Sequence, residues 1–532
     1  MGPQKLFAVL LLAITSTGVG AAPNPQGKGV TEDSQKAANP VRTLTILHTN
    51  DIHGHLHPWQ GWDGDLKDKT VGGLDRVSEN VNKVRSSVTS GSVLLLDAGD
   101  TIGDSMVAVE TEGRAVIETM NAIGYDAMVV GNHEPDFTAD KLLERIKQAR
   151  FPVLAANITY RKDGELFTKP YVMREVNGVQ VGILGLAYPN TALTSAQKNV
   201  EGLRFSEAVE TAREYVPRLR REGAQIVIAL THLGLGADKN LAEKVDGIDV
   251  IVGGHSHNRM KEPLEVRQTL IVQAGAHGSD LGRLDLKIAD GRIESHHGTL
   301  IPITAGGLDE AITALIERQS APHKEKMSAS IGTAMTVIPR AQTIAGQESE
   351  KRDAESPADD LFADAIRETT GVEVAFLPGL GYGVALQPGE ITSAHLRNLI
   401  PHDSAVWTLR LTGQQIREVL EQAIENFSTT DVTEKVGGMI QVSGLQFQYD
   451  PESERSDRVK NITIGDRELV RRRRYAVAIN GLLAEGGHNY EEFERGTDRR
   501  EVGNQYDMVR SWIERRGDVS APRTDRIIDV SR

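Results

Sequence analysis

The chain has 532 residues, more than one hydrophobic core normally supports, so we expect two folded domains. Hydrophobic residues make up 39% and charged residues 25%, which excludes a disordered, collagen-like or membrane-embedded protein. The formal net charge of −14 argues against sequence-independent binding to nucleic acid or to anionic membranes. Any anionic ligand would therefore need cations placed locally at its site.

The first 22 residues have the order of a secretory signal peptide. An apolar run follows Lys5, and small residues follow that run up to Ala21 and Ala22. We predict cleavage after one of these alanines, followed by a flexible leader over residues 23–41. The alternative is a membrane anchor, for which the run is too short. With no cysteine in the chain, disulfides and thiol catalysis are excluded, and the mature protein is expected to be exported, periplasmic or secreted, without an anchor.

Short apolar runs alternate with helical patterns and predict the buried strands of an α/β domain over residues 42–310. The runs are residues 44–47, 93–96, 127–130, 225–230 and 250–252. A charged helical stretch at 311–335 is expected to link this domain to a second one. Residues 336–532 combine two amphipathic helices, at 359–370 and 414–427, with β-like runs, which predicts an α+β domain.

Side chains that can bind metals follow these strands at their carboxyl ends, where the sites of α/β proteins are built. The segments are Asp51-Ile52-His53, Asp97-Ala98-Gly99-Asp100, Gly131-Asn132-His133-Glu134-Pro135-Asp136, Thr231-His232 and Gly254-His255-Ser256-His257. One such segment could be a polar turn, but five in one domain indicate a common site. Two divalent ions about 3.5–4 Å apart need several ligands each and a bridging group, which this set provides. The mixed oxygen and imidazole donors suit manganese, zinc, iron or cobalt better than calcium.

This ordered series resembles the signature of the calcineurin-like metallophosphoesterases. More narrowly, residues 49–54, 72–76 and 151–158 resemble the exported 5′-nucleotidase and UDP-sugar hydrolase family, and the resemblance extends over nearly all of the mature chain. It implies a four-layer α/β/β/α catalytic domain, a helical linker and a C-terminal substrate-binding domain whose rotation opens and closes the active site. It also implies a hydrolase that releases phosphate from nucleotides or related esters by attack of a metal-bound water.

The resemblance extends to individual residues. One metal would be bound by Asp51, His53, Asp100 and His257. The other would be bound by Asp100, Asn132, His232 and His255. Asp100 would therefore bridge the two ions. His133 resembles the histidine that contacts the phosphoryl group, with Asp136 orienting its ring, whereas Glu134 is left outside the catalytic set.

The substrate-binding positions of the second domain match the family only in part. Arg352 resembles a substrate-binding arginine, and Tyr490 resembles one of two aromatic residues that stack on a nucleotide base. Pro378 and Gly383 stand where the family has asparagine and arginine. Met439 replaces the other ring, and a thioether stacks less specifically on a base. Further aromatic or cationic candidates near the expected pocket are Tyr382, His402 and Trp407.

Two alternative functions remain open. A related thiosulfohydrolase family uses the same two-metal scaffold on a sulfur-containing substrate, and its second domain resembles the Pro-Gly-X-X-Tyr-Gly segment at 378–383. Against it, residues 132–134 keep the phosphoesterase form Asn-His-Glu. The other alternative is a non-catalytic protein that binds a phosphate ligand, and the complete sets of metal ligands argue against it. We expect a small-molecule phosphate substrate, no nucleic-acid polymer as partner, and a monomer.

Overall fold

The computed structural model describes residues 41–304, 306–340, 354–379, 383–432 and 434–531. The predicted signal peptide, most of the leader, and the candidate substrate residues Arg352 and Tyr382 lie outside these ranges. Within them, no helix combines the length and the apolar character needed to cross a bilayer.

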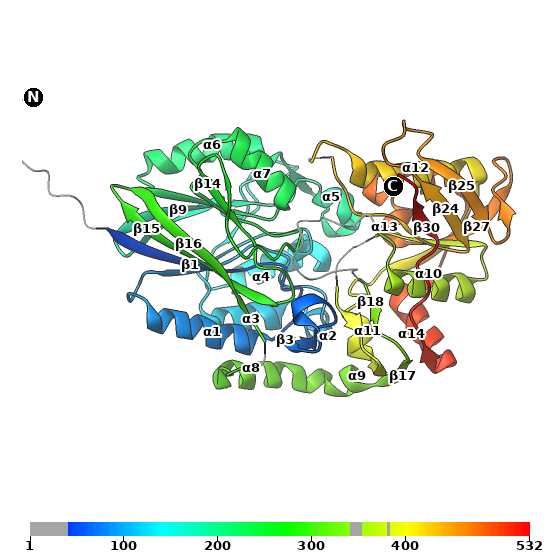
Figure 1. The fold of residues 1–532 in the computed structure, drawn as a ribbon, viewed down its shortest axis with the longest axis horizontal. Helices are drawn as coiled ribbons and strands as arrows, with labels where there is room; N and C mark the ends of the chain where they lie inside the picture. Colours follow the sequence, from blue (N-terminus) through cyan, green and yellow to red (C-terminus); the bar gives the residue numbers. More distant parts are fainter. Residues whose placement is uncertain (1–40, 305, 341–353, 380–382, 433, 532) are drawn as a thin grey trace, which may run out of the picture. The chain divides into compact units, whose positions relative to one another are not determined.

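Two six-stranded sheets form the centre of residues 42–302 (Figure 1). The first, in the order β16-β15-β1-β4-β5-β6, consists of β1 (Arg42–Thr49), β4 (Val93–Asp97), β5 (Ala127–Val129), β6 (Val153–Leu154), β15 (Asp280–Ala289) and β16 (Arg292–Pro302). The second, in the order β13-β14-β12-β11-β9-β8, consists of β8 (Tyr171–Val176), β9 (Val179–Leu186), β11 (Ile226–Thr231), β12 (Val250–Val252), β13 (Leu264–Val266) and β14 (Thr269–Val272). Strands β1, β4, β5 and β6 are parallel, as are β9, β11, β12 and β14. Each sheet therefore presents the segments that follow its parallel strands at one edge.

The two sheets pack face to face and carry helices on their outer sides (Figure 1). Apolar side chains of β1 and β4 meet those of β9 and β11 in one buried cluster between the sheets. A second cluster joins the first sheet to α1 (Leu74–Ser87) and α3 (Arg114–Ile123). A third joins the second sheet to α6 (Ala208–Arg221) and α7 (Leu235–Lys244). This arrangement confirms the predicted four-layer α/β/β/α fold, and all five predicted strands are present.

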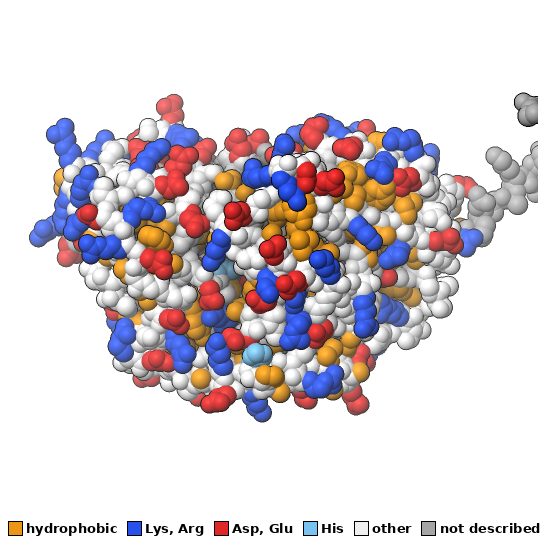
Figure 2. All heavy atoms as spheres, turned by 180° about the vertical axis from the view of Figure 1, so that it is seen from behind, with side chains coloured by type: hydrophobic (Ala, Val, Ile, Leu, Met, Phe, Trp, Pro, Cys, Tyr) orange, Lys and Arg blue, Asp and Glu red, His pale blue; other side chains and the backbone are white. Residues whose placement is uncertain are grey.

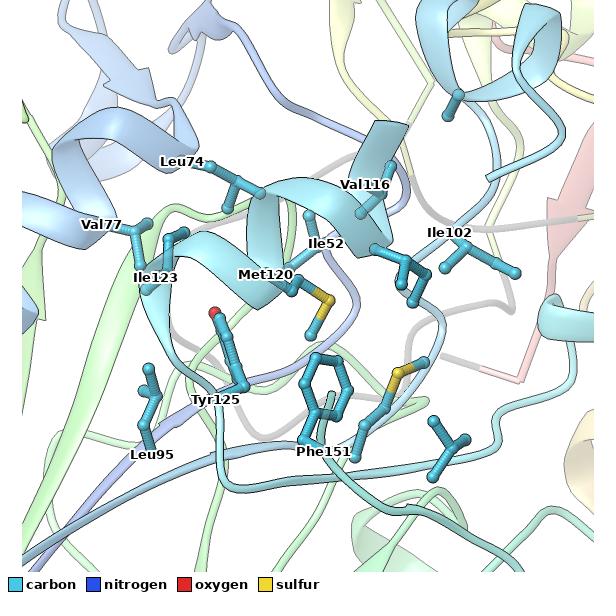
Figure 3. Close-up of a cluster of buried hydrophobic side chains, with 14 of the residues drawn as sticks. Ile52, Leu74, Val77, Leu95, Ile102, Val116, Met120, Ile123, Tyr125 and Phe151 are labelled. Carbon is cyan, nitrogen blue, oxygen red and sulfur yellow. The ribbon is translucent and has the colours of Figure 1, made fainter. Parts of the chain in front are cut away.

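The cluster that contains α3 also takes in apolar residues within or next to two of the segments predicted to bind metal (Figure 3). Ile52 comes from the segment after β1, and Ile102 comes from the segment after β4. Both side chains point into the cluster, where Met120 and Phe151 also pack, and both are buried. Because protein interiors are close-packed, these apolar anchors hold the polar residues beside them at fixed positions.

The C-terminal residues fold around a five-stranded sheet in the order β23-β19-β27-β22-β28. Its strands are β19 (Val374–Leu377), β22 (Ala405–Thr412), β23 (Gln441–Ser443), β27 (Arg474–Asn480) and β28 (Thr497–Asn504). Successive residues of β19 alternate between two apolar clusters, as a strand buried on both faces requires. One cluster contains α10 (Pro357–Thr370) and α14 (Gln505–Arg516), and the other contains α12 (Gly413–Ser428). Both predicted helices are therefore present within this α+β domain.

Smaller strands complete the C-terminal region and connect it to the linker. They are β17 (Ser330–Ala334), β21 (Gly389–Thr392) and β29 (Asp518–Val519) in one sheet, and β24 (Leu445–Tyr449), β25 (Val459–Ile464), β26 (Arg467–Glu468) and β30 (Ile527–Asp529) in another. The stretch predicted to be the linker contains α8 (Glu310–Ser320), which begins one residue before it, and α9 (Lys324–Ser328). Ile312 and Ile316 of α8 belong to the cluster of Figure 3, so this helix packs with the N-terminal region.

Charge is mixed over the surface that Figure 2 shows. On this face, acidic and basic side chains are interspersed, without a continuous basic stripe among the atoms that are described.

Candidate dimetal active site

The predicted metal ligands lie at the carboxyl ends of five parallel strands from both sheets. Asp51, Asp100 and Asn132 follow β1, β4 and β5 of the first sheet. His232 and His255 follow β11 and β12 of the second. The backbone N–H of His255 donates to the Asp51 carboxylate (3.0 Å), so the two strand ends are joined directly across the sheets. The fold thus delivers donors from distant parts of the chain to one buried place.

Two groups of side chains in this place could each hold a cation. Asp51, His53 and Asp100 form one group, in which one ligand atom of each residue lies within 4.8 Å of the others. Asp100, His232 and His255 form the second group on the same criterion. Asp100 belongs to both, as the predicted bridging role requires.

His257 lies beside the first of these groups. Its Nε2 is 3.2 Å from Asp51 Oδ1 and 3.2 Å from His53 Nε2. In the second group, His232 Nε2 is 2.9 Å from Asp100 Oδ2. Six of the seven predicted ligands are therefore in direct mutual proximity.

The donor set fits divalent cations. Asn132, the seventh predicted ligand, has a buried Oδ1 with no hydrogen-bond partner among the described residues. A buried acceptor left in this state costs about 1–3 kcal/mol, which coordination would remove. Carboxylate, amide oxygen and imidazole together suit manganese, iron, cobalt and zinc. The site residues are thus chemically matched to the metals that the sequence predicts.

The backbone at this site is held in conformations that residues other than glycine rarely adopt. Positive φ angles occur at Asp51 (51°), His53 (49°), Asp100 (54°), His255 (76°) and His257 (58°). Each such conformation costs on the order of 1–3 kcal/mol and persists only where the surrounding structure imposes it. At Asp51, His53 and Asp100, hydrogen bonds between the segment after β1 and the segment after β4 impose this conformation. Asp51 N–H donates to Gly99 O and His53 N–H donates to Asp100 O, both at 2.9 Å.

The histidine rings are oriented through their Nδ1 atoms. His232 Nδ1 is 2.7 Å from the backbone oxygen of Ala98, so Nε2 is the nitrogen that faces Asp100. His53 Nδ1 is 2.6 Å from Asp104 Oδ2, and both side chains are buried. A carboxylate or carbonyl behind a ligating imidazole fixes its tautomer and raises its basicity.

Asp104 was not identified from the sequence. The sequence feature that could have identified it is its position after β4: Asp104 is the second aspartate of the segment Gly99-Asp100-Thr101-Ile102-Gly103-Asp104. Like the predicted ligands, Asp104 has a positive φ, of 77°.

Glu134 holds two of the metal-binding segments together. Its buried carboxylate accepts hydrogen bonds from the backbone N–H groups of Asp100 (2.9 Å), Thr101 (2.7 Å) and Gly131 (2.6 Å). A Cβ at Gly131 would lie 2.3 Å from Asp100 Oδ1, so only glycine fits between these groups. Glu134 therefore helps to hold the Asp100 backbone in place.

His133 and Asp136 form a pair at the rim of the metal centre. The short 3-10 helix Glu134–Phe137 turns the chain so that His133 Nδ1 lies 2.8 Å from Asp136 Oδ2. His133 Nε2 lies 4.0 Å from Asp100 Oδ2, so this nitrogen faces the centre. Burial lowers the pKa of His133, but the carboxylates of Asp100 and Asp136 outweigh it and raise the pKa to about 10. The metal-free protein therefore carries a protonated His133 at neutral pH.

A second histidine contacts the same pair. The ring of His402 stacks on that of His133, with centroids 4.9 Å apart and an interplanar angle of 7°. His402 Nδ1 is 3.1 Å from Asp136 Oδ2. Burial raises the pKa of Asp136, but His133 and His402 outweigh it and lower the pKa. Of the two further candidates that the structure describes, His402 and Trp407, His402 is the one that contacts the predicted catalytic pair.

The two predicted substrate residues that the structure describes, Met439 and Tyr490, lie in a core rather than at a site. Met439 is 0% exposed and Tyr490 1%, and both belong to the apolar core of the C-terminal domain. The Tyr490 ring packs against that of Phe493, with centroids 5.9 Å apart. Trp407 is half-buried in β22, where the Arg499 guanidinium lies 5.6 Å from its ring. Neither Met439 nor Tyr490 offers a face to a ligand in this structure.

Comparison with known proteins identifies both halves of the chain. Residues 44–259 match the family model for calcineurin-like phosphoesterases, and residues 330–495 match the one for the 5′-nucleotidase C-terminal domain. The chain is 27% identical over 536 residues to the trifunctional nucleotide phosphoesterase protein YfkN of Bacillus subtilis (strain 168). This match covers 92% of the chain but only 35% of the Bacillus protein, so the chain spans about a third of that relative.

Two solved structures resemble the whole described fold. The 5′-nucleotidase precursor from Thermus thermophilus superimposes with a TM-score of 0.82 at 26% identity, covering 92% of this chain and 100% of that one. The sulfate thiohydrolase SoxB of Thermus thermophilus, in complex with glycerol, gives a TM-score of 0.81 at 26% identity, covering 92% and 97%. The chain is therefore a metal-dependent phosphoester hydrolase of the 5′-nucleotidase family, with a calcineurin-like phosphoesterase domain followed by a 5′-nucleotidase C-terminal domain.

Proposed function

We propose that this enzyme binds two divalent cations bridged by Asp100 and releases phosphate from nucleotides or related small phosphate esters outside the cytoplasm. The observation that carries the proposal is the pair of ligand groups that share Asp100. One ion would be held by Asp51, His53, Asp100 and His257. The other would be held by Asp100, Asn132, His232 and His255. When bound, the cations supply positive charge that stabilises the oxygens of the phosphoryl group during its transfer.

His133 is proposed to act on the phosphoryl group. With Nδ1 held by Asp136, its Nε2 faces the centre and can donate a hydrogen bond to a phosphoryl oxygen or a proton to the leaving oxygen. The negative charge of Asp136 favours the protonated ring that such donation needs. Positioned acids of this kind contribute about 10²–10⁴-fold to rate.

Recognition of the leaving group is proposed to fall to the C-terminal domain, from about residue 336 onward, beyond the linker at 311–335. Arg352 and Tyr382 are proposed contacts. Met439 and Tyr490, which are buried in this structure, are proposed to contact the substrate only when the C-terminal core opens. The absence of the family's asparagine and arginine at Pro378 and Gly383 supports a substrate range that differs from that of a strict nucleotidase, since a missing buried polar contact changes discrimination strongly.

Export is proposed from the signal-peptide pattern of residues 1–22. The name of the Thermus relative, a 5′-nucleotidase precursor, supports this proposal.

A thiosulfohydrolase is the second candidate, because the SoxB structure matches this fold as closely as the nucleotidase does. The segment at 378–383 also favours it. The pairing of His133 with Asp136, next to Asn132 and Glu134, favours the phosphoesterase.

The test is a substrate panel assayed with added manganese and with chelator. Nucleotides, UDP-glucose, a cyclic nucleotide, an aryl phosphate and an S-alkyl thiosulfate (R–S–SO3⁻) would be compared, with both phosphate and sulfate measured in the products. Chelator-sensitive phosphate release from nucleotides is the expected result. Sulfate release alone would establish the second candidate, and a protein that holds two metals without any turnover would be a binding protein.

A further inference from the structure

His277 lies beside the proposed metal centre but belongs to neither of the predicted ligand sets. It follows β14, the next parallel strand of the second sheet after β12, so it obeys the same strand-end rule as the other ligands. Its backbone is held on both sides: its N–H donates to Asp51 O at 2.7 Å, and its oxygen accepts from Trp59 Nε1 at 3.0 Å. Its φ is 54°, in the range found at five of the seven predicted ligands.

The side chain of His277 is buried against two ligands of the first metal. One of its ring nitrogens lies within 4.8 Å of the ligand atoms of His53 and His257. The ring centroids are 5.4 Å and 5.7 Å away, respectively. The His277 side chain has no hydrogen-bond partner at Nδ1 among the described residues, although the residue is only 3% exposed. A histidine that merely filled this space would leave a buried polar atom unsatisfied, at about 1–3 kcal/mol.

We propose that His277 is a further ligand of the metal held by Asp51, His53 and His257. This inference rests on the proposed dimetal function and adds a residue to it. Three imidazoles on one ion favour a borderline metal such as zinc or cobalt over manganese, which prefers oxygen donors. The two metal positions would therefore differ in selectivity, because the described ligands of the other ion include only two imidazoles.

His55 provides a matched control. Its ring lies 4.5 Å from that of His277 and is equally buried. His55 Nε2 also has no hydrogen-bond partner among the described residues. However, His55 belongs to none of the described groups that could hold a metal, and its Nδ1 faces the backbone oxygens of His53 (3.0 Å) and Ile52 (3.1 Å), which ties the ring to the backbone. His55→Phe and His277→Phe therefore remove neighbouring imidazoles of the same size from the same environment, and only the second is expected to remove a ligand.

The test uses the full chain loaded with Co²⁺. Ligating imidazoles give hyperfine-shifted exchangeable N–H signals in the proton NMR spectrum, and a competing chelator reports the affinity of each ion. In His277→Phe we expect one such signal fewer and binding of one of the two ions weakened about tenfold or more. In His55→Phe, both the number of signals and the affinities should match the wild type.

A rescue experiment separates ligation from packing. His277→Gly suits the positive φ and leaves a cavity beside the metal, so added imidazole should restore the missing signal and the affinity. Wild-type signals and affinities in both His277 variants, with two Co²⁺ bound, would overturn this inference and leave the proposed function standing. A wild-type chain that binds no metal would instead overturn the proposed function itself. Circular dichroism of each variant establishes that it is folded.

Discussion

The two halves of this molecule each contain a buried carboxyl group, Asp100 and Asp360, whose pKa values are shifted in opposite directions. In the N-terminal half, burial raises the pKa of Asp100, but His232 and His133 outweigh it and hold the pKa well below its usual range. In the C-terminal half, burial and a hydrogen bond with Glu355 raise the pKa of Asp360 to about 10, so Asp360 is neutral at physiological pH. Burial alone therefore does not mark a cation site. The partner decides: imidazoles keep a buried carboxylate charged and ready for metal, whereas a second carboxyl group keeps it protonated.

The halves also differ in how their candidate residues are placed. The predicted metal ligands follow strands directly, within three residues for Asp51, Asp100 and His232, so the sheets fix their positions. The predicted substrate residues Met439 and Tyr490 lie in the core of the C-terminal domain. The two sheets thus position the candidate reaction site. The last prediction tests whether substrate specificity depends on residues of the C-terminal core.

Replacing the bridging residue should have the largest effect. Asp100→Asn removes the only side chain shared by both ligand groups, and each cation is worth several kcal/mol of transition-state stabilisation. We expect kcat to fall about 10⁴-fold or more and metal content to fall with it. Elemental analysis of the dialysed variant measures the metal, and phosphate release measures kcat. Full metal content in this variant would show that Asp100 does not bridge.

His133→Ala should separate catalysis from metal binding. The ring faces the centre but belongs to neither proposed ligand set, so kcat should fall about 10²–10³-fold with metal content nearly unchanged. Equal loss of metal in His133→Ala and Asp100→Asn would refute the division of roles between the two residues.

Metal affinity should depend steeply on pH. Burial lowers the pKa of His232, but Asp100 outweighs it and raises the pKa to about 9 in the metal-free protein. Because a metal must displace this proton, the apparent affinity should weaken about tenfold per pH unit below about 9 and level off above it. The same raised pKa stabilises the metal-free fold below pH 6.5, and this stabilisation is lost as the pH rises through about 9. Chelator competition, corrected for the chelator's own protonation, measures the affinity, and a flat profile between pH 7 and 9 would contradict the assignment.

Asp104→Asn tests the residue behind His53. Asparagine keeps the shape and an acceptor for Nδ1 but lacks the charge that raises the basicity of the ring, so metal affinity should fall about tenfold. Asp126→Asn is the control. Asp126 directly precedes β5, so it lies at the opposite end of that strand from the predicted metal ligands, and its carboxylate accepts a hydrogen bond from Leu95 N–H of β4. Equal affinities in the two variants would show that Asp104 has no special role.

The proximity of the predicted metal ligands follows from the sequence because they come directly after buried strands. An apolar run locates a strand, and the polar residues after it must lie at the sheet edge, as they do for Asp51 and His255. Asp104 and His277 obey the same rule but were missed. Asp104 is the second aspartate of its segment, and the strand before His277 was not among the predicted runs, although β14 occupies residues 269–272.

The contact of His402 with Asp136 could not be predicted in this way. It joins residues 266 positions apart and depends on the packing of a C-terminal segment near the catalytic pair, which no local pattern specifies. Likewise, the motif positions of Met439 and Tyr490 gave no information on whether their side chains face a ligand or a core. That choice is set by the tertiary packing around Phe376 and Phe493.

Tyr490→Leu is expected to have the smallest effect on catalysis, and it can break the contrast between the halves. Leucine keeps an apolar side chain in the core but cannot stack on a base, and stacking is worth about 1–3 kcal/mol per base. If Tyr490 works only in the core, as its 1% exposure indicates, the protein should lose stability while KM changes less than about twofold for every substrate. If the ring contacts the base, KM should rise about fivefold or more for nucleotides and stay unchanged for an aryl phosphate. The ratio of the KM for nucleotides to the KM for the aryl phosphate therefore separates the two roles, even if a loosened domain binds both substrates more weakly. A rise for nucleotides alone would mean that the C-terminal core opens to expose Tyr490 during turnover.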